Sequence, residues 1–197
     1  MLNYVLNGGI VTLPGFFPAN KYWDIKRDLD ENLEWRESHQ PFKNQYGNRL
    51  QAFPCYESPY DKENDFTINK LEDILQTKIC DFKTLARKIV LSEIKQSPQN
   101  FGKYGFIHRD TSVEDKKPLI AAVMYFDQAY DGGTAFFHSQ MEKVPDIYIS
   151  SVPNRLVLYS GGIQHAPCLD YTFKERKTIS YFFRLQEKDD KQKEYDN

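Results

Sequence analysis

The chain has few cysteines. It contains three, Cys55, Cys80 and Cys168, which lie far apart and show no C-x-x-C spacing. This usage fits a reduced intracellular protein better than a disulfide scaffold. The first ten residues also lack the basic flank and long apolar run of a signal peptide. We therefore expect a cytoplasmic protein.

Long apolar runs and an excess of one charge are also absent. No stretch reaches the roughly 18 apolar residues that a membrane helix needs. The formal net charge is −2, which gives no bulk argument for binding to nucleic acid or to an anionic membrane. We therefore expect neither of these partners. The sequence does not indicate an oligomeric state.

Apolar and aromatic residues are abundant, at 40% and 15% of the 197 residues. This is the composition of a folded protein, and the length suits one domain with one sizeable core. We predict a single domain over residues 1–186, with a helical part at 1–100 and a β core at about 101–186. Residues 187–197 are mostly charged and have little to bury, so they predict a solvated tail.

Helical patterns dominate the prediction for the first half. Residues 20–37 predict a helix with Asn20 as its N-cap, and the apolar residues of its buried side would be Trp23, Leu29, Leu33 and Trp35. Residues 66–94 predict a longer helix, because apolar residues recur there at steps of three and four. Prolines and glycines between them, at 41–65, indicate loops with one strand near 50–56.

The second half changes character, because short runs of β-branched and aromatic residues alternate with turn signals. Strands are predicted over residues 104–110, 119–126, 134–138, 147–150, 155–159, 164–168 and 178–185. Many short strands at such spacing are typical of a closed barrel or a double-sheet jelly roll. The fold class expected is mainly β, with helices of the first half buttressing one sheet.

A candidate metal site lies in this second half. His108 stands two residues before Asp110, and residues i and i+2 of a strand point to the same face, so both can reach one ion. His165 follows 55 residues after Asp110 and would come from a neighbouring strand. His138 is an alternative third ligand, while His39 has the setting of an exposed helix end. Two histidines and a carboxylate leave open coordination positions, which suits iron(II).

Three blocks between residues 104 and 185 extend this pattern. The first is H-R-D at 108–110. The second is L-I-A-A-V-M-Y-F-D followed by Y-D-G-G-T-A-F-F, over 119–137. The third is N-R-L-V-L-Y-S-G-G-I-Q-H-A-P, followed by R-K-T-I-S-Y-F-F. In order, spacing and strand character they resemble the 2-oxoglutarate/Fe(II)-dependent dioxygenase superfamily, in its prolyl-hydroxylase-like branch.

The resemblance implies a double-stranded β-helix that uses Fe(II), 2-oxoglutarate and molecular oxygen. It implies that His108, Asp110 and His165 hold iron, that Arg176 binds the far carboxylate of 2-oxoglutarate, and that Tyr125 reaches the same carboxylate. Lys174 and Lys177 are alternatives to Arg176. Thr178 and Ser180 follow Arg176 at i+2 and i+4, so in a strand they share its face and can add hydroxyl donors.

The function expected from this resemblance is hydroxylation of an amino-acid or peptidyl, prolyl-like C–H bond, with release of succinate and CO2. Two alternatives stay open: a cupin-type metal-binding barrel that acts without 2-oxoglutarate, and a non-catalytic binding module. The partner would be a small molecule or a peptide. Residues 40–60 and 111–117 are candidate lids, with Tyr46, Arg49, Tyr56 and Arg109 as candidate substrate contacts.

Overall fold

The computed structural model describes residues 1–38, 55–96, 103–111, 118–128, 131–139 and 144–186. Several predictions fall outside these ranges. They concern His39, the candidate contacts Tyr46 and Arg49, most of both candidate lids and the charged tail.

Seven strands form the larger of two sheets, in the order β1-β8-β5-β10-β4-β3-β2, and every pairing is antiparallel. Their bounds are β1 Val11–Pro14, β2 Arg36–Glu37, β3 Tyr56–Pro59, β4 Ile79–Val90, β5 Ile120–Tyr125, β8 Arg155–Ser160 and β10 Glu175–Leu185. The long strands β4 and β10 pair over most of their length and carry the centre of this sheet.

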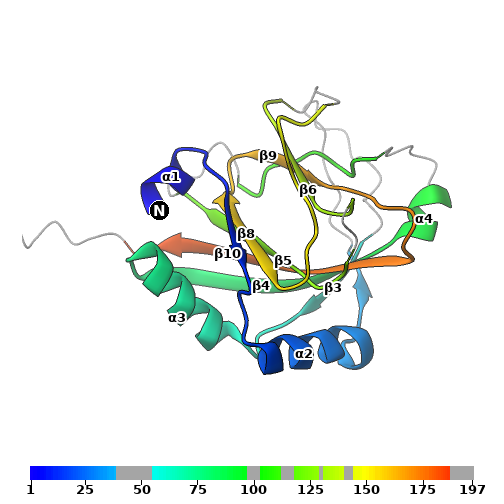
Figure 1. The fold of residues 1–197 in the computed structure, drawn as a ribbon, viewed down its shortest axis with the longest axis horizontal. Helices are drawn as coiled ribbons and strands as arrows, with labels where there is room; N and C mark the ends of the chain where they lie inside the picture. The colour runs from blue at the N-terminus through cyan, green and yellow to red at the C-terminus, as the bar shows by residue number, and fades with distance from the viewer. Residues whose placement is uncertain (39–54, 97–102, 112–117, 129–130, 140–143, 187–197) are drawn as a thin grey trace, which may run out of the picture.

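Three short strands form the smaller sheet, in the order β7-β6-β9. Their bounds are β6 Thr134–Phe137, β7 Ile147–Ile149 and β9 Gln164–Pro167. From β5 onward the chain passes from the large sheet to β6 and β7, returns to β8, crosses to β9 and returns to β10. This winding is the jelly-roll arrangement expected from the sequence, and Figure 1 shows β6 and β9 above the larger sheet.

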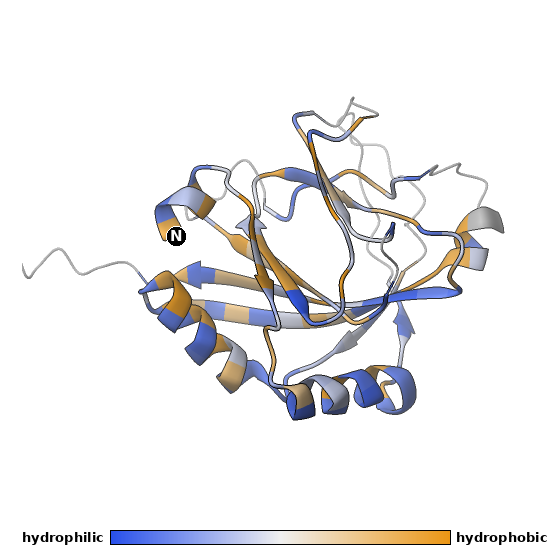
Figure 2. Ribbon diagram, in the orientation of Figure 1, coloured by the Kyte–Doolittle hydropathy of each residue, from blue (hydrophilic) through white to orange (hydrophobic). Residues whose placement is uncertain are grey.

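The larger sheet is buried on both faces at its centre, as β5 shows. All six of its residues are buried. Ile120, Ala122 and Met124 pack toward the helices, whereas Ala121, Val123 and Tyr125 pack toward the smaller sheet. Strand β5 therefore reads as a continuous apolar run, whereas Figure 2 shows blue segments as well as orange ones along β4 and β10.

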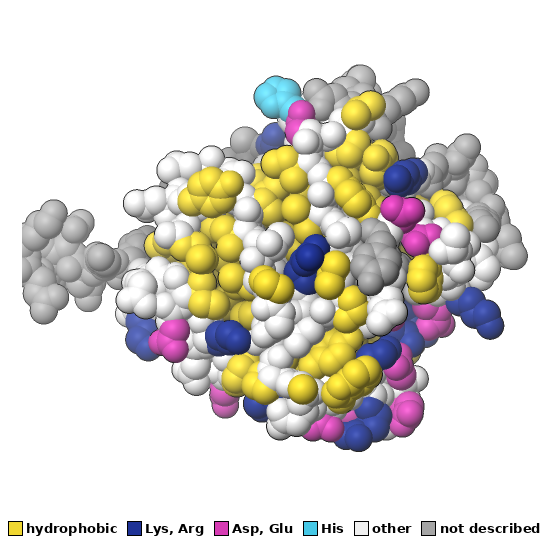
Figure 3. All heavy atoms as spheres, viewed as in Figure 1, with side chains coloured by type: hydrophobic (Ala, Val, Ile, Leu, Met, Phe, Trp, Pro, Cys, Tyr) yellow, Lys and Arg dark blue, Asp and Glu magenta, His cyan; other side chains and the backbone are white. Residues whose placement is uncertain are grey.

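Helices cover the outer face of the larger sheet, as predicted. Figure 1 shows α2 (Ala19–Arg27) and α3 (Asn64–Leu75) below it, while α1 (Leu2–Leu6) and α4 (Leu91–Gln96) lie at its sides. On the face seen in Figure 3, acidic and basic side chains gather together along the lower edge near α2. Within the described ranges, no helix has the length and apolarity to cross a membrane.

The predicted helix over residues 66–94 is wrong beyond Leu75. Helix α3 ends there, because the next residue, Gln76, has a left-handed φ of 55°, and the chain returns as β4. Phe82 and Ala86 of β4 face the helices, while Leu85 and Ile89 face the opposite side. Apolar residues on both faces of one strand happen to repeat at steps of three and four, which imitates a helix.

The predicted helix over residues 20–37 is too long, and its cap is wrong. Helix α2 has Pro18 at its N-cap position, and a π-helical turn, η1 (Asp28–Asn32), ends it. Leu29 is buried as predicted, but the Trp23 side chain is 61% exposed. The predicted strand over residues 104–110 is reduced to isolated bridges. The described residues among 1–100 thus contribute four strands as well as helices.

Asp28 ties the end of α2 to the loop after β3. Its buried carboxylate accepts hydrogen bonds from Lys62 at 2.7 Å, Asn32 at 3.0 Å and Tyr60 at 3.3 Å. Burial by itself raises the pKa of this carboxyl, but the three donors outweigh it, so the pKa of Asp28 lies below its ordinary value. The ionised carboxylate therefore stabilises the folded state.

We predict that Asp28→Asn lowers the free energy of unfolding at pH 7 by roughly 1–3 kcal/mol, because it removes a buried acceptor of charge-assisted hydrogen bonds. A carboxyl with a lowered folded pKa stabilises above its unfolded pKa of about 3.9, and this contribution is lost as the pH falls through the folded value. Urea unfolding at pH 7 and near pH 3 should show the gap between wild type and variant narrowing in acid.

The matched control is Asp24→Asn on the same helix. Asp24 and its partner Arg27 are each 60% exposed, so this change should alter stability by less than about 0.5 kcal/mol. The role given to Asp28 would be contradicted if both variants lost the same free energy of unfolding. It would also be contradicted if the difference in stability between wild type and Asp28→Asn grew at acid pH.

Candidate metal centre and cavity

Two backbone hydrogen bonds bring the predicted metal ligands together. The His108 N–H donates to the carbonyl of His165, and the His165 N–H donates to that of His108, both at 2.9 Å. Asp110 lies two residues beyond His108, so its side chain reaches the same point. One ligand atom each from His108, Asp110 and His165 lies within 4.8 Å of the others.

Hydrogen bonds also fix the imidazole rings. Nδ1 of His108 lies 2.9 Å from the carbonyl of Phe106, and Nδ1 of His165 lies 3.0 Å from that of Ile163. A proton on each Nδ1 places the lone pair of each ring on Nε2. These Nε2 atoms lie 3.6 Å and 3.4 Å from the carboxylate oxygens of Asp110. Hydrogen bonds at Nδ1, such as these two to backbone carbonyls, orient histidine ligands in metal sites.

The surroundings of His165 and Asp110 favour the protonation states that bind a metal. The Asp110 and His165 side chains are each 6% exposed. Burial lowers the pKa of His165 to about 4, so its imidazole is neutral at physiological pH. Burial acts in the opposite direction on Asp110, but the neighbouring histidines outweigh it and hold its pKa well below the ordinary value. A neutral imidazole beside an ionised carboxylate fits a divalent cation.

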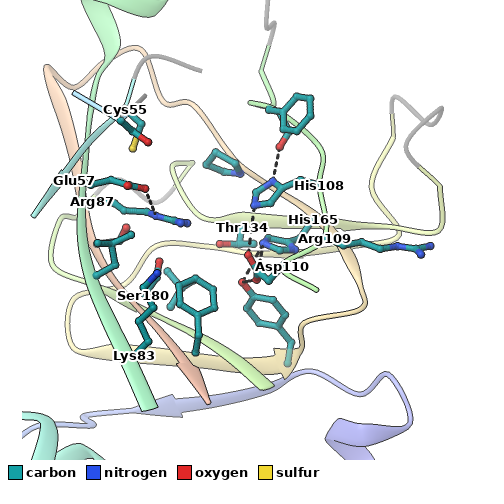
Figure 4. Close-up of a pocket in the computed structure, with 18 of the residues that line it drawn as sticks. Cys55, Glu57, Lys83, Arg87, His108, Arg109, Asp110, Thr134, His165 and Ser180 are labelled. Atoms are coloured by element: carbon teal, nitrogen blue, oxygen red, sulfur yellow. Dashed lines mark hydrogen bonds and ion pairs between the residues drawn. The ribbon is translucent and has the colours of Figure 1, made fainter. Parts of the chain in front are cut away.

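A cavity of about 490 Å³ lies beside this cluster. Its walls come from β3, β4 and β10 of the larger sheet, and from β6, β9 and the segment at 103–111 (Figure 4). Arg176, Thr178 and Ser180 of β10 line it, as their shared face predicts. The metal cluster therefore opens into a space that carries a cation and two hydroxyls.

No protein-family model and no curated protein matches this chain. Solved structures do. A prolyl-4-hydroxylase from Pseudomonas putida has a TM-score of 0.60 at 14% identity, over 94% of this chain and 97% of that one. HygX from Streptomyces hygroscopicus, with nickel, 2-oxoglutarate and hygromycin B bound, has a TM-score of 0.57 at 10% identity, over 93% and 86%.

A third match is a prolyl hydroxylase from Trichoplax adhaerens, in complex with a peptide fragment of hypoxia inducible factor. Its TM-score is 0.58 at 13% identity, over 92% of this chain and 88% of that one. This chain has the fold of the 2-oxoglutarate/Fe(II) oxygenases. The fold expected from the sequence motifs is confirmed over nearly the whole chain.

Within this oxygenase fold, Arg176 lies at a buried end of the cavity. Its Nε donates to the carbonyl of Gly132 at 3.4 Å and Nη2 to that of Gly133 at 3.2 Å. The alternative Lys177 points to the other side of β10 and pairs with Asp30 at 2.7 Å. Among Arg176, Lys177 and Lys174, only Arg176 lines the cavity.

Tyr125 does not line the cavity itself but lies behind the residues that do. Its ring lies 5.8 Å from the Arg176 guanidinium carbon, and its hydroxyl is 2.7 Å from the hydroxyl of Thr134, which does line the cavity. Burial raises the pKa of Tyr125 to about 12, so the phenol keeps its proton. Tyr125 therefore adjoins Arg176, and Thr134 is the hydroxyl between it and the cavity.

Tyr159 of β8 is a site residue that sequence reasoning missed. Its buried hydroxyl lies 3.3 Å from Oδ2 of Asp110 and 3.1 Å from Nε2 of His165. A signal was available, because Tyr159 shares the inward face of its strand with Val157. With Nε2 of His165 on a metal, the phenol can still donate to Asp110 and orient that carboxylate.

Other predicted positions lie away from the cluster. His138 is exposed and follows the end of β6. Arg109 borders the cavity, but Figure 4 shows its side chain pointing away from His108 and Asp110. The Tyr56 hydroxyl donates to the carboxylate of Glu93 at 3.0 Å.

We predict that His108→Ala or Asp110→Ala weakens binding of manganese(II), used as a redox-inert stand-in, by more than the roughly 10–100-fold that loss of an outer hydrogen-bond partner costs. The physical reason is the loss of one of three donors in the cluster. Calorimetric titration of the apoprotein measures the affinity, and the wild type should bind one ion per chain. His138→Ala is the control and should bind manganese(II) as the wild type does. Full binding by the double variant H108A/D110A would disprove the assignment.

Proposed function

We propose that this protein is an Fe(II)- and 2-oxoglutarate-dependent oxygenase that hydroxylates an amino-acid or peptidyl, prolyl-like C–H bond and releases succinate and CO2. One observation carries the proposal. The cluster of His108, Asp110 and His165 shares a cavity with a buried arginine, Arg176. A three-donor site with open positions suits iron(II), and a guanidinium suits the far carboxylate of a bound keto acid.

In this proposal His108, Asp110 and His165 hold iron, and Arg176 receives the distal carboxylate of 2-oxoglutarate. Thr178 and Ser180 supply hydroxyl donors from the same face of β10, and Tyr125 acts through Thr134. When bound, iron(II) and 2-oxoglutarate supply the oxidising chemistry with molecular oxygen. The protein contributes position and the exclusion of water, since the walls that carry these side chains are largely buried.

Similarity of fold supports the class of enzyme more strongly than the substrate. Two similar structures are prolyl hydroxylases, one with a peptide, whereas another holds hygromycin B and a fourth is the epimerase SnoN from nogalamycin biosynthesis. A prolyl-like substrate is therefore the proposal that agrees with both the sequence motifs and two of these structures.

The two alternative functions, a cupin-type protein and a non-catalytic module, explain fewer of the side chains that line the cavity. A cupin-type protein that acts without 2-oxoglutarate has no use for a buried arginine facing the metal site. A non-catalytic module has no need of three oriented ligands. We further propose that residues 1–186 form one domain and that the protein is cytoplasmic, as its cysteine usage suggests.

We predict that Arg176→Met weakens 2-oxoglutarate binding by about thirty-fold or more. Removing one partner of a buried charge pair costs roughly 2–5 kcal/mol, and 2 kcal/mol corresponds to that factor. Arg176→Lys should restore only part of the affinity, because an ammonium keeps the charge but lacks the planar fork. The measurement is a titration of 2-oxoglutarate into the anaerobic iron(II) protein, followed by the visible band of the chelated keto acid.

Lys177→Met is the matched control, since it removes a cation from the opposite face of the same strand. Its affinity for 2-oxoglutarate should equal that of the wild type. Iron binding should survive in both variants, because the three candidate ligands lie on β9 and on the segment at 103–111 that is bridged to it, not on β10. Undiminished 2-oxoglutarate affinity in Arg176→Met would exclude Arg176, and a wild type that never forms the band would refute the proposed function.

A further inference from the structure

A second arginine, Arg87, faces the same cavity from β4. It pairs with Thr178 of β10 in the ladder of the larger sheet, so both side chains line the cavity. Figure 4 shows the Arg87 guanidinium pointing from β4 into the space in front of Asp110 and His165. Arg87 and Arg176 therefore both line the cavity, from the adjacent strands β4 and β10.

The two arginines differ in accessibility and in partners. Arg176 is 7% exposed, and two backbone carbonyls hold it. The Arg87 side chain is 29% exposed, and that of Glu57, its neighbour on β3, is 21% exposed. A buried arginine suits a cosubstrate that is enclosed in the cavity. A more accessible arginine suits a molecule that enters and leaves through the open side.

Arg87 has unused hydrogen-bonding capacity. Its Nε lies 3.3 Å from Oε1 of Glu57, an ion pair whose alignment is not that of a hydrogen bond. Its guanidinium carbon also lies 5.5 Å from the centre of the Phe182 ring. Among the described residues, no oxygen accepts a hydrogen bond from its terminal nitrogens. A planar guanidinium whose terminal nitrogens have no acceptor within the described part of the chain is matched by a ligand carboxylate, which can accept two parallel hydrogen bonds.

The Glu57 carboxylate beside this guanidinium narrows the ligand further. The two residues are direct partners across the β3–β4 ladder, so opposite charges stand side by side at the rim of the cavity. An ion pair with a purely structural role would not need to face a cavity, and more of the guanidinium nitrogens would donate hydrogen bonds to the carboxylate. A zwitterion satisfies both groups, with its carboxylate on Arg87 and its primary or secondary ammonium group on Glu57.

We propose that Arg87 and Glu57 bind the carboxylate and the protonated amine of a free α-amino or α-imino acid. This inference rests on the proposed function and sharpens it, because an internal residue of a peptide carries neither charge. The substrate of the oxygenase is then a free amino acid held at its backbone end by β3 and β4. Its side chain extends toward the metal cluster.

The test is binding of the twenty common L-amino acids to the anaerobic iron(II) protein saturated with 2-oxoglutarate, followed by perturbation of the keto-acid band. At least one acid should perturb the band saturably. Its primary amide should bind about thirty-fold more weakly, the factor expected when a buried charge pair loses one partner. A terminally blocked tripeptide with the same residue at its centre should not bind detectably.

Three variants separate the roles. Arg87→Met should weaken binding of the amino acid by about thirty-fold, and it should reduce the difference in affinity between the amino acid and its amide. The affinity for 2-oxoglutarate should stay within about threefold of the wild-type value. Glu57→Gln should weaken binding of the amino acid more than that of its deamino analogue. Lys88→Met is the matched control, since Lys88 lies over Trp35 on the other face of β4 and should behave as wild type.

Several results would overturn the proposal. A large loss of 2-oxoglutarate affinity in Arg87→Met would assign Arg87 to the cosubstrate. Binding of the blocked tripeptide, or no response to any amino acid, would exclude a free amino acid as the ligand. If Arg87→Met fails to fold, the affinities of the wild-type protein for the amino acid and for its amide still test the proposal. Absence of the keto-acid band is a different failure, because it refutes the proposed function itself.

Discussion

The geometry of the candidate site depends on one pair of backbone hydrogen bonds, between His108 and His165. Each residue donates to and accepts from the other, and this pairing occurs without a continuous strand around His108. Because the two chain segments meet in this register, both imidazoles turn toward Asp110. The hydrogen bonds at Nδ1 then direct Nε2 inward. A shift of one residue would turn one histidine to the opposite face and disperse the three donors.

The two sheets carry different groups of the residues of the candidate site. The candidate metal ligands belong to the smaller sheet and to the segment bridged to it, whereas Arg87 and Arg176 belong to β4 and β10 of the larger sheet. The larger sheet can carry these polar residues because its opposite face packs against α2 and α3. Strand β10 shows this directly, since Arg176, Thr178 and Ser180 face the cavity while Ile179 and Tyr181 lie in the core.

The sequence was sufficient for the parts with local signals. Strands β5 to β10 follow short apolar runs bounded by turns, and the spacing of His108 and Asp110 indicated a shared face. It was insufficient for β4, because apolar residues on both faces of that strand imitate helical periodicity. Arg87 was missed for this reason, since a residue assigned to a helix has no predictable place in a cavity. Tyr159 was missed because an aromatic residue in a buried strand usually belongs to the core.

The apolar layer between the sheets has a consequence for how the protein tolerates change. Val123, Tyr125, Phe136 and Val157 pack there, and this layer separates the sheet that carries the metal donors from the sheet that carries the arginines. The thickness of this layer therefore sets the span between the two groups of side chains, which a keto acid bound as proposed would have to match. A substitution of modest size in this layer can be absorbed by small movements of the sheets with little loss of folding energy. The same movement changes the span, so the length of the ligand that fits can be adjusted from positions such as Phe136 and Val157, which do not line the cavity.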